Sequence, residues 1–135
     1  MNVNKVIINA DGAARGNPGP AAIGATIKDE GGNIIASISR RIGITTNNQA
    51  EYRAIITALE KAVSLGARQV ILKSDSKLIV EQINGRYKIK NTALRPLYQE
   101  IVRLTGSLEN ITISYVPRSR NAEADKLANK ALDSM

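Results

Sequence analysis

The sequence predicts an α/β protein whose mixed five-stranded sheet, antiparallel over its first three strands, is flanked by helices in the order βββαβααβα. Three strand-like runs joined by short, turn-rich connections open the chain, which indicates an antiparallel meander. A helical pattern then precedes a short, nearly all-apolar run, an order typical of a crossover to a parallel strand. Because the 135 residues contain no linker, repeat or low-complexity segment, we expect one domain over residues 1–135.

The first three strands are separated by residues that favour turns. Residues 3–10 have the apolar character of a buried strand, and residues 11–20 are rich in Gly, Pro and Asn, which predicts a tight loop. We expect a second strand over residues 21–28 and a turn at residues 31–33. Residues 33–42 alternate apolar and polar side chains, which predicts a third, half-exposed strand.

A long helix follows, with Thr46 or Asn47 as its N-cap. Apolar residues recur at helical spacing from Ala50 to Ala62, and the pair Leu65-Gly66 predicts the end of the helix. Residues 69–74 are then expected to form the fourth strand, parallel to the first.

The last third of the chain predicts three helices and one strand. We expect a short helix over residues 76–83, a basic connector over residues 85–90, and a helix over residues 94–104, in whose first turn Pro96 is tolerated. Residues 111–116 predict the fifth strand, which Pro117 ends, and residues 121–132 predict the final helix.

The charge balance favours a polyanionic partner. The chain has 19 Lys and Arg against 12 Asp and Glu, with a net charge of +7. Its aromatic residues are four Tyr, without Phe or Trp, which argues against a stacking platform for single-stranded bases. A duplex bound through its backbone fits this composition better.

The absence of Cys and His excludes several chemistries. Disulfides, thiolate or histidine metal sites, and Ser-His-Asp or Cys-His nucleophiles all require residues that the chain lacks. Hydrolysis would therefore depend on carboxylates, lysine or metal-bound water. No apolar stretch approaches the roughly 18 residues of a membrane span, and the first residues run directly into a strand pattern. We therefore expect a cytoplasmic, monomeric protein without a membrane partner.

Four acids occupy the predicted ends of elements in this basic chain. Asp11 follows the first strand and Asp75 the fourth, while Glu51 and Asp125 lie near the starts of two helices. Taken singly, each has a structural interpretation, as a turn former or as a complement to the helix dipole. In open α/β sheets, however, sites lie beyond the carboxyl ends of the strands. The four acids together suggest divalent metals acting on a phosphate ester.

Four segments resemble the motifs of type 1 ribonuclease H. They are residues 11–19 (DGAARGNPG), 45–51 (TTNNQAE), 74–76 (SDS) and 121–128 (NAEADKLA). The resemblance covers essentially the whole chain, and implies a ribonuclease H-like fold. It also implies an endonuclease that hydrolyses the RNA strand of RNA/DNA hybrids and leaves 3′-hydroxyl and 5′-phosphate ends.

The resemblance also implies the roles of individual residues. By position, the family's catalytic, metal-binding carboxylates match Asp11, Glu51, Asp75 and Asp125. Two Mg²⁺ ions would lie between them and the scissile phosphate, one activating water and the other stabilising the leaving 3′-oxygen, and Mn²⁺ could substitute. Positions that contact the minor groove, where the 2′-hydroxyl distinguishes RNA from DNA, match Gly12, Ala13, Asn17, Asn48 and Gln49. Thr46 and Asn47 match contacts to a phosphate of the DNA strand.

The chain departs from the family pattern at two places. Arg118 stands where many members have a loop histidine, and resembles a subset of the family that uses arginine there. An arginine stays charged at neutral pH, so we expect it to hold a phosphate rather than to carry protons. Many bacterial members also have a long basic handle, of which only residues 85–91 are present. Lys88 and Lys90, with Arg86, are predicted to contact phosphates instead.

Three alternatives remain open at this point. The same fold could act also or mainly on double-stranded RNA or on RNA–DNA junctions, which share the 2′-hydroxyl and A-like geometry. The chain could instead be a non-catalytic module that binds hybrids, although its four carboxylates argue against this. It could also be a basic α/β domain that does not bind nucleic acid.

Overall fold

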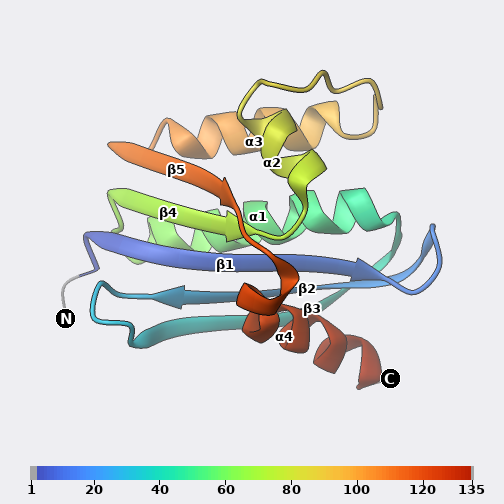
Figure 1. Cartoon of the computed structure of the whole chain (residues 1–135), viewed down its shortest axis with the longest axis horizontal. Helices are drawn as coiled ribbons and strands as arrows, with labels where there is room; N and C mark the ends of the chain where they lie inside the picture. The colour runs from blue at the N-terminus through green and yellow to red at the C-terminus, as the bar shows by residue number, and fades with distance from the viewer. Residues whose placement is uncertain (1–2, 135) are drawn as a thin grey trace.

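A computed structural model describes residues 3–134, with Met1, Asn2 and Met135 outside the described residues (Figure 1). Its elements are β1 (Lys5–Ala14), β2 (Gly19–Lys28), β3 (Ile34–Thr45), α1 (Asn47–Ser64), β4 (Gln69–Ser74), α2 (Lys77–Ile83), α3 (Arg95–Thr105), β5 (Asn110–Tyr115), the 3₁₀ helix η1 (Arg118–Arg120) and α4 (Ala122–Asp133). The predicted order of strands and helices is confirmed, and η1 is an addition to it.

The strands form one mixed sheet in the order β3-β2-β1-β4-β5. β1 pairs with β2, and β2 with β3, in antiparallel fashion, whereas β4 is parallel to both β1 and β5. The predicted meander and the predicted crossover to a parallel strand are therefore confirmed. Among the described residues, no helix combines the length and apolar character needed to cross a membrane.

Helices cover the two faces of the sheet unequally. α1 crosses one face behind β1 and β2, with α3 beside it toward the β5 edge, whereas α4 lies in front of the sheet, over β1, β2 and β3 (Figure 1). The main core forms between α1 and the sheet, where Val6 and Ile8 of β1 meet Tyr52, Ile55 and Leu59 of α1. Each large apolar side chain buried there stabilises the fold by roughly 1.5–3 kcal/mol.

The start of α1 is fixed by a capping box. The Thr46 hydroxyl accepts a hydrogen bond from Gln49 N, and the Gln49 side chain accepts one from Thr46 N. Thr46, rather than Asn47, is therefore the N-cap, and two amides of the first turn are satisfied reciprocally. At the other end, Gly66 has a φ of 91°, a conformation that residues with a side chain rarely adopt.

The predicted loop over residues 11–20 is wrong for most of its length. β1 continues to Ala14 and β2 already begins at Gly19, so the connection covers only residues 15–18. Residues 12–14 lack the alternation of a strand, but they pair with residues 21–23 of β2, and that pairing supplies their backbone hydrogen bonds. β3 likewise extends to Thr45, beyond the predicted end at Ile42.

Candidate active site

Asp11 and Asp75 meet where β4 stops pairing with β1. The last parallel pair is Ala10 with Ser74, so the two acids are the next residues on neighbouring strands. Asp75 follows the end of its strand, as predicted. Asp11 does not, because β1 continues for three more residues along β2. Losing one neighbouring strand leaves room beside Asp11 for side chains from other elements.

Gly12 brings Glu51 of α1 against this point of the sheet. A Cβ atom on Gly12 would lie 2.2 Å from the backbone carbonyl carbon of Ala50, so only glycine permits the observed approach of α1. The Gly12 amide donates a 2.5 Å hydrogen bond to Glu51 Oε1. Glu51 lies in the second turn of α1, not the first as expected, and is only 4% exposed.

A second glycine positions Asp125. Gly24 of β2 pairs with Asp11, and a Cβ atom on it would lie 2.2 Å from the carbonyl oxygen of Ala124. α4 can therefore lie directly on the sheet and present Asp125 from its first turn, as predicted. The Asn129 side chain donates to the Asp125 backbone oxygen at 3.0 Å and to Oδ1 at 3.2 Å, which holds the carboxylate in place.

Asn121 ties the start of α4 to β1. Its side chain is buried, donates to the carbonyl oxygen of Ala10 at 2.9 Å, and accepts from Asn9 Nδ2 at 3.0 Å. The Asn121 amide also lies close enough to the Asp75 side chain to lower the pKa of that carboxyl, against the larger effect of burial. One buried amide thus connects the strand before Asp11, the carboxylate of Asp75 and the helix of Asp125.

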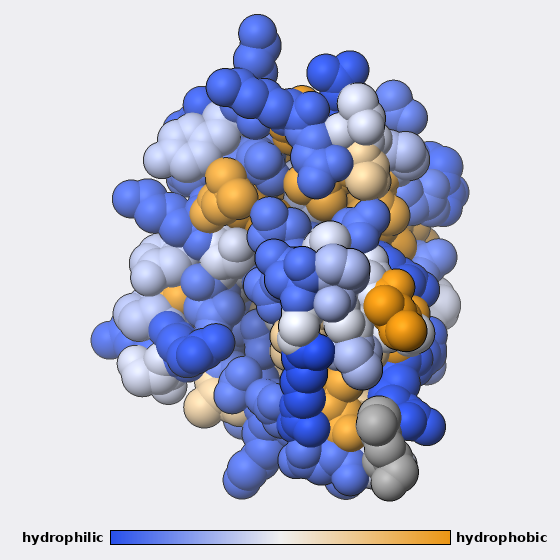
Figure 2. Space-filling view, turned by 90° about the vertical axis from the view of Figure 1, so that its right-hand side faces the viewer, coloured by the Kyte–Doolittle hydropathy of each residue, from blue (hydrophilic) through white to orange (hydrophobic). Residues whose placement is uncertain are grey.

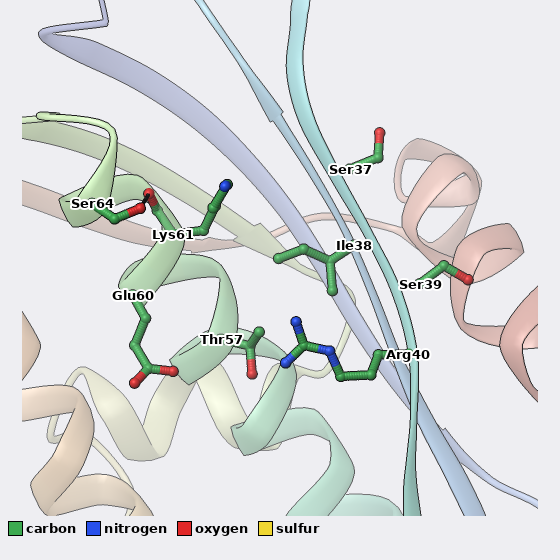
Figure 3. A pocket seen from close by; sticks show the side chains of 8 residues that line it. All are labelled: Ser37, Ile38, Ser39, Arg40, Thr57, Glu60, Lys61 and Ser64. Carbon is green, nitrogen blue, oxygen red and sulfur yellow. Dashed lines mark hydrogen bonds between the residues drawn. The ribbon is translucent and has the colours of Figure 1, made fainter.

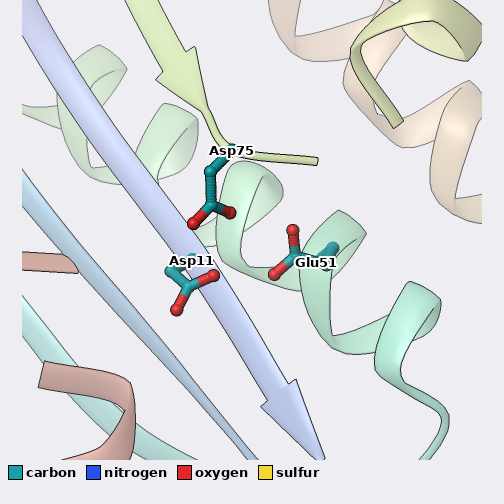
Figure 4. A group of neighbouring side chains, drawn as sticks. All are labelled: Asp11, Glu51 and Asp75. Carbon is teal, nitrogen blue, oxygen red and sulfur yellow. The ribbon is translucent and has the colours of Figure 1, made fainter. Parts of the chain in front are cut away.

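The carboxylates converge on one hollow. Asp11, Glu51 and Asp75 each offer an oxygen within 4.8 Å of the others, and Figure 4 shows them turned toward one another from β1, α1 and the end of β4. The hollow has a volume of about 320 Å³. Its lining consists of Asp11, Gly12, Ala13, Asn47, Glu51, Asp75, Ser76, Tyr115, Arg118 and Asp125.

Burial makes the charged state of this cluster unfavourable. Removal from water raises the pKa of Asp11 to about 7, and the charge of Asp75 adds to this shift. Burial and the neighbouring Asp11 raise the pKa of Glu51 well above its usual value. The pKa of Asp75 is also raised by burial, although the nearby Arg118 opposes the shift. Without a cation, the cluster therefore retains protons at pH values where isolated carboxylates have lost them.

The cluster fits a hard divalent cation. Asp75 Oδ2 is buried and accepts no hydrogen bond from the described residues. Three carboxylate oxygens at mutual distances within 4.8 Å provide the all-oxygen donor set that Mg²⁺ and Mn²⁺ prefer. A bound cation would supply the orphaned oxygen with a partner, and its charge would offset the burial and the mutual repulsion that raise the pKa values.

Arg118 lies at the rim of the hollow. It belongs to η1, and its Nε atom is 3.8 Å from Asp75 Oδ2, although its side chain is 83% exposed. The segment before it is anchored, since the Val116 amide donates to the Ser74 carbonyl oxygen at 2.9 Å. The guanidinium therefore faces both the carboxylates and solvent, where it can reach an incoming anion.

The predicted substrate residues are divided between two regions. Gly12, Ala13 and Asn47 line the carboxylate hollow. The exposed Asn17 accepts a 3.0 Å hydrogen bond from the Asn47 amide, so it lies beside the same hollow. The capping box that Thr46 and Gln49 form, together with Asn48, continues this surface along the first turn of α1.

The structure does not bring Lys88 and Lys90 to the carboxylates. Both are exposed on the connector between α2 and α3, and Lys88 lines a separate hollow with Tyr87, Arg95 and Tyr98. Figure 2 views the end of the molecule that carries the β1–β2 connection and the start of α1. Hydrophilic residues cover most of this face, and apolar residues form isolated patches.

Besides the supporting amides of Asn121 and Asn129, sequence reasoning missed three contributors. Tyr115 and Ser76 line the hollow, and Gly24 lies beneath α4. Ser76 directly follows Asp75, and its position as the N-cap of α2 was the available signal. Tyr115 and Gly24 carry no local signal, because their importance depends on segments distant in the sequence.

Comparisons with known proteins agree with this geometry. A family model described as "Reverse transcriptase-like" matches residues 9–131. A bifunctional protein of Mycobacterium tuberculosis is 46% identical over 96% of this chain, and the chain spans 36% of that protein. Ribonuclease HI of Halobacterium salinarum is 43% identical over 91% of this chain, which spans 62% of that protein.

A solved structure shows the same fold. LC11-RNase H1 in complex with an RNA/DNA hybrid superimposes with a TM-score of 0.91 at 43% identity, covering 96% of this chain and 97% of that one. The match of the family model over most of the chain agrees with the arrangement of the sheet, the helices and the acidic cluster. The chain therefore belongs to the ribonuclease H-like family.

Proposed function

We propose that this chain is a metal-dependent endoribonuclease that hydrolyses the RNA strand of RNA/DNA hybrids and leaves 3′-hydroxyl and 5′-phosphate ends. The observation that carries the proposal is the cluster of Asp11, Glu51 and Asp75, whose oxygens lie within 4.8 Å of one another in a hollow that opens to solvent. Membership of the family and the hybrid bound to LC11-RNase H1 support the choice of substrate.

Asp11, Glu51, Asp75 and Asp125 would hold two Mg²⁺ or Mn²⁺ ions. When bound, such ions supply an activated water and charge stabilisation for the leaving 3′-oxygen. The chain's own contribution is to fix the ligands before substrate arrives. The Gly12 amide holds Glu51, and the Asn129 amide holds Asp125. Little reorganisation is then needed at the reacting phosphate.

Arg118, at the rim of the hollow beside Asp75, would hold the scissile phosphate. Its guanidinium offers several donors and keeps its charge throughout the reaction. The Arg118 side chain is largely exposed, and its Nε atom lies 3.8 Å from Asp75 Oδ2. An incoming phosphate could therefore replace Asp75 as the partner of the guanidinium. A fixed charge of this kind stabilises negative charge that develops on the phosphate oxygens.

The surface beside the hollow would distinguish the two strands of the hybrid. The backbone at Gly12 and Ala13, with Asn17, Asn48 and Gln49, would contact the minor groove, where a 2′-hydroxyl both donates and accepts hydrogen bonds. Thr46 and Asn47 would contact a phosphate of the DNA strand. The hydrogen bond from the Asn47 amide to Asn17 holds these two parts of the surface next to each other.

Cleavage of an end-labelled RNA/DNA hybrid in Mg²⁺ tests the proposal. We expect the RNA strand to be cut, and Asp75→Asn to lose the activity while keeping the fold. Double-stranded RNA and double-stranded DNA are tested as alternative substrates in the same assay. Comparable cutting of double-stranded RNA would widen the substrate class. Binding of the hybrid without cutting, in Mg²⁺ and in Mn²⁺, would contradict the proposal and indicate a binding module.

A further inference from the structure

A second polar hollow, of about 480 Å³, lies between β3 and the C-terminal half of α1 (Figure 3). Its lining consists of Ser37, Ile38, Ser39, Arg40, Thr57, Glu60, Lys61 and Ser64. None of these residues lines the carboxylate hollow. Thr57 follows Glu51 on α1 by one and two-thirds turns, about 9 Å along the helix axis. We call this second hollow the β3–α1 hollow.

The β3–α1 hollow contains two positive charges that no acid neutralises. Arg40 and Lys61 are both exposed, and neither forms an ion pair within residues 3–134. Glu60 is the only acid in the lining. Its side chain points away from both cations in Figure 3, and it forms no ion pair with either of them within residues 3–134. An anion entering the hollow would therefore meet a net positive charge, from two cations and one acid.

Of the four hydroxyl groups, two have no hydrogen-bond partner among the described residues, and one of these two faces the hollow. Ser39 donates to the Leu127 carbonyl oxygen at 2.7 Å, and Ser64 donates to the Lys61 carbonyl oxygen at 2.6 Å. Ser37 points away from α1 in Figure 3. The Thr57 hydroxyl has no hydrogen-bond partner in the described part of the chain, and it faces the end of the Arg40 side chain across the hollow.

We propose that the β3–α1 hollow binds a phosphate group through Arg40 and Thr57, which face each other, while Lys61, on the other side of Ile38 in Figure 3, adds a second positive charge to the hollow. The Arg40 guanidinium and the Thr57 hydroxyl can donate to adjacent oxygens of a tetrahedral anion, and the Lys61 ammonium can reach a further phosphate of the same molecule. The volume exceeds that of a single phosphate, so the group can be carried on a larger molecule. Two sources share this chemistry: a free diphosphate-type compound, and a backbone phosphate of a nucleic acid that extends beyond the carboxylate hollow.

Titrations of the isotope-labelled protein, followed by amide and side-chain NMR signals, test this proposal. The probes are pyrophosphate and a single-stranded DNA of eight nucleotides, which contains no ribonucleotide and so cannot be cleaved by the proposed activity. A chelator removes divalent cations, so the carboxylate hollow stays negatively charged or neutral and does not bind the anionic probes. We expect the largest shifts at Arg40, Thr57 and Lys61. Arg40→Gln and Lys61→Gln should each weaken binding about fivefold or more, by the loss of one charged contact.

Arg41→Gln is the matched control, because it removes the same charge from the next residue of β3 but lies outside the lining of the hollow. Binding of pyrophosphate at the three residues, unaffected by Arg41→Gln, would support a free ligand as the source. Binding of the DNA there, competed by pyrophosphate, would support a backbone phosphate. If neither probe shifts these signals, or if all three variants weaken binding equally, the proposal is wrong.

Discussion

The carboxylate cluster and the basic connector carry opposite charges and are built in opposite ways. Asp11 and Glu51 are 5% and 4% exposed, and their positions depend on backbone contacts at Gly12. Lys88 and Lys90 lie exposed on the connector, and neither forms an ion pair among the described residues. The cluster places like charges where water cannot screen them, whereas the connector leaves its charges in water.

This difference determines how each region responds to change. In the cluster, a change of one atom alters the positions or proton affinities of several groups together, because the groups are buried and touch. On the connector, each charge acts through solvent and salt, so its effect is smaller and independent of its neighbours. Mutations should therefore have large, coupled effects in the cluster and small, additive effects on the connector.

Asp11→Asn should produce the largest effect. The pKa of Asp11 in the fold is about 7, against a usual 3.8, so the folded protein binds the proton more tightly than the unfolded chain. The metal-free protein therefore loses stability as the pH rises from about 4 to 7, by up to about 4 kcal/mol. The variant lacks this loss, so above pH 7 it should be more stable than the native protein, yet inactive.

Urea unfolding between pH 4.5 and 8, with a chelator present, measures this difference. Adding Mn²⁺ or Mg²⁺ should stabilise the native protein at pH 8 and stabilise the variant much less, because binding is linked to folding. If the free energy of unfolding depends on pH in the same way in both proteins, the ionised form of Asp11 is not destabilised by burial, and the prediction is wrong.

Gly12→Ala should have the next largest effect. The added methyl group would lie 2.2 Å from a backbone carbon of Ala50, so α1 must move away from β1 and take Glu51 with it. We expect a loss of about 3 kcal/mol in the free energy of unfolding, and a fall in cleavage by the molecules that remain folded. Calorimetry and the cleavage assay measure the two effects.

Gly31→Ala is the control for this variant. A Cβ atom there would approach only the side chains of Asn33 and Asp29, at 3.2 and 3.4 Å, on an exposed turn. It should leave both stability and cleavage nearly unchanged. Equal behaviour of the two variants would mean that the approach of α1 at Gly12 does not position Glu51.

The proximity of Asp11 and Asp75 can be predicted from the sequence because it depends only on the residues next to each acid. Two apolar runs, one parallel to the other, must end near the same edge of a sheet, and each acid follows its run. The same reasoning failed for the extent of β1. Gly12 and the two alanines after it have no side chains that signal a strand, and only pairing with β2 makes them one.

The parts of the site that local reasoning could not reach depend on distant segments. Gly24 matters because α4 lies on it, and nothing in residues 19–28 indicates that contact. The role of Asn121 likewise depends on distant residues, because its buried amide forms hydrogen bonds with Asn9 and Ala10 near the other end of the chain. The position of Asp125 near the start of a predicted helix made it one of four candidate acids, and the resemblance of its motif then assigned it a role as a metal ligand.

Arg118→Ala tests the boundary between the two kinds of region, because this arginine is exposed but faces a buried acid. The Arg118 charge lowers the pKa of Asp75, against the larger upward effect of burial. Removing it should raise the pKa of Asp75, and weaken Mn²⁺ binding more at pH 6 than at pH 8. We expect cleavage to fall about tenfold, the size of a lost charged contact.

Arg118→Lys separates charge from shape. Lysine keeps the charge near Asp75, so it should restore metal binding at pH 6, but it should restore cleavage only in part, because it lacks the planar set of donors. NMR titration of the Asp75 carboxyl carbon reports the pKa directly. An unchanged Asp75 pKa in Arg118→Ala would assign the arginine to the phosphate alone.

Lys88→Glu and Lys90→Glu should have the smallest effects. Each exposed charge contributes through the long-range field, so each reversal should raise KM for the hybrid several-fold and leave kcat unchanged. The dependence of KM on salt should become shallower, since fewer ions are released when the hybrid binds. Steady-state kinetics at three salt concentrations measure both quantities.

Lys130→Glu, on the last turn of α4, makes the same charge change away from both the connector and the lining of the carboxylate hollow. If it raises KM as much as Lys88→Glu does, the connector contributes only net charge, and its placement near α3 is irrelevant to the hybrid. If it does not, the connector forms a second contact with the duplex. Because that contact lies in water, the double variant should then show the product of the two single effects, whereas paired changes in the cluster of Asp11, Glu51 and Asp75 should not multiply.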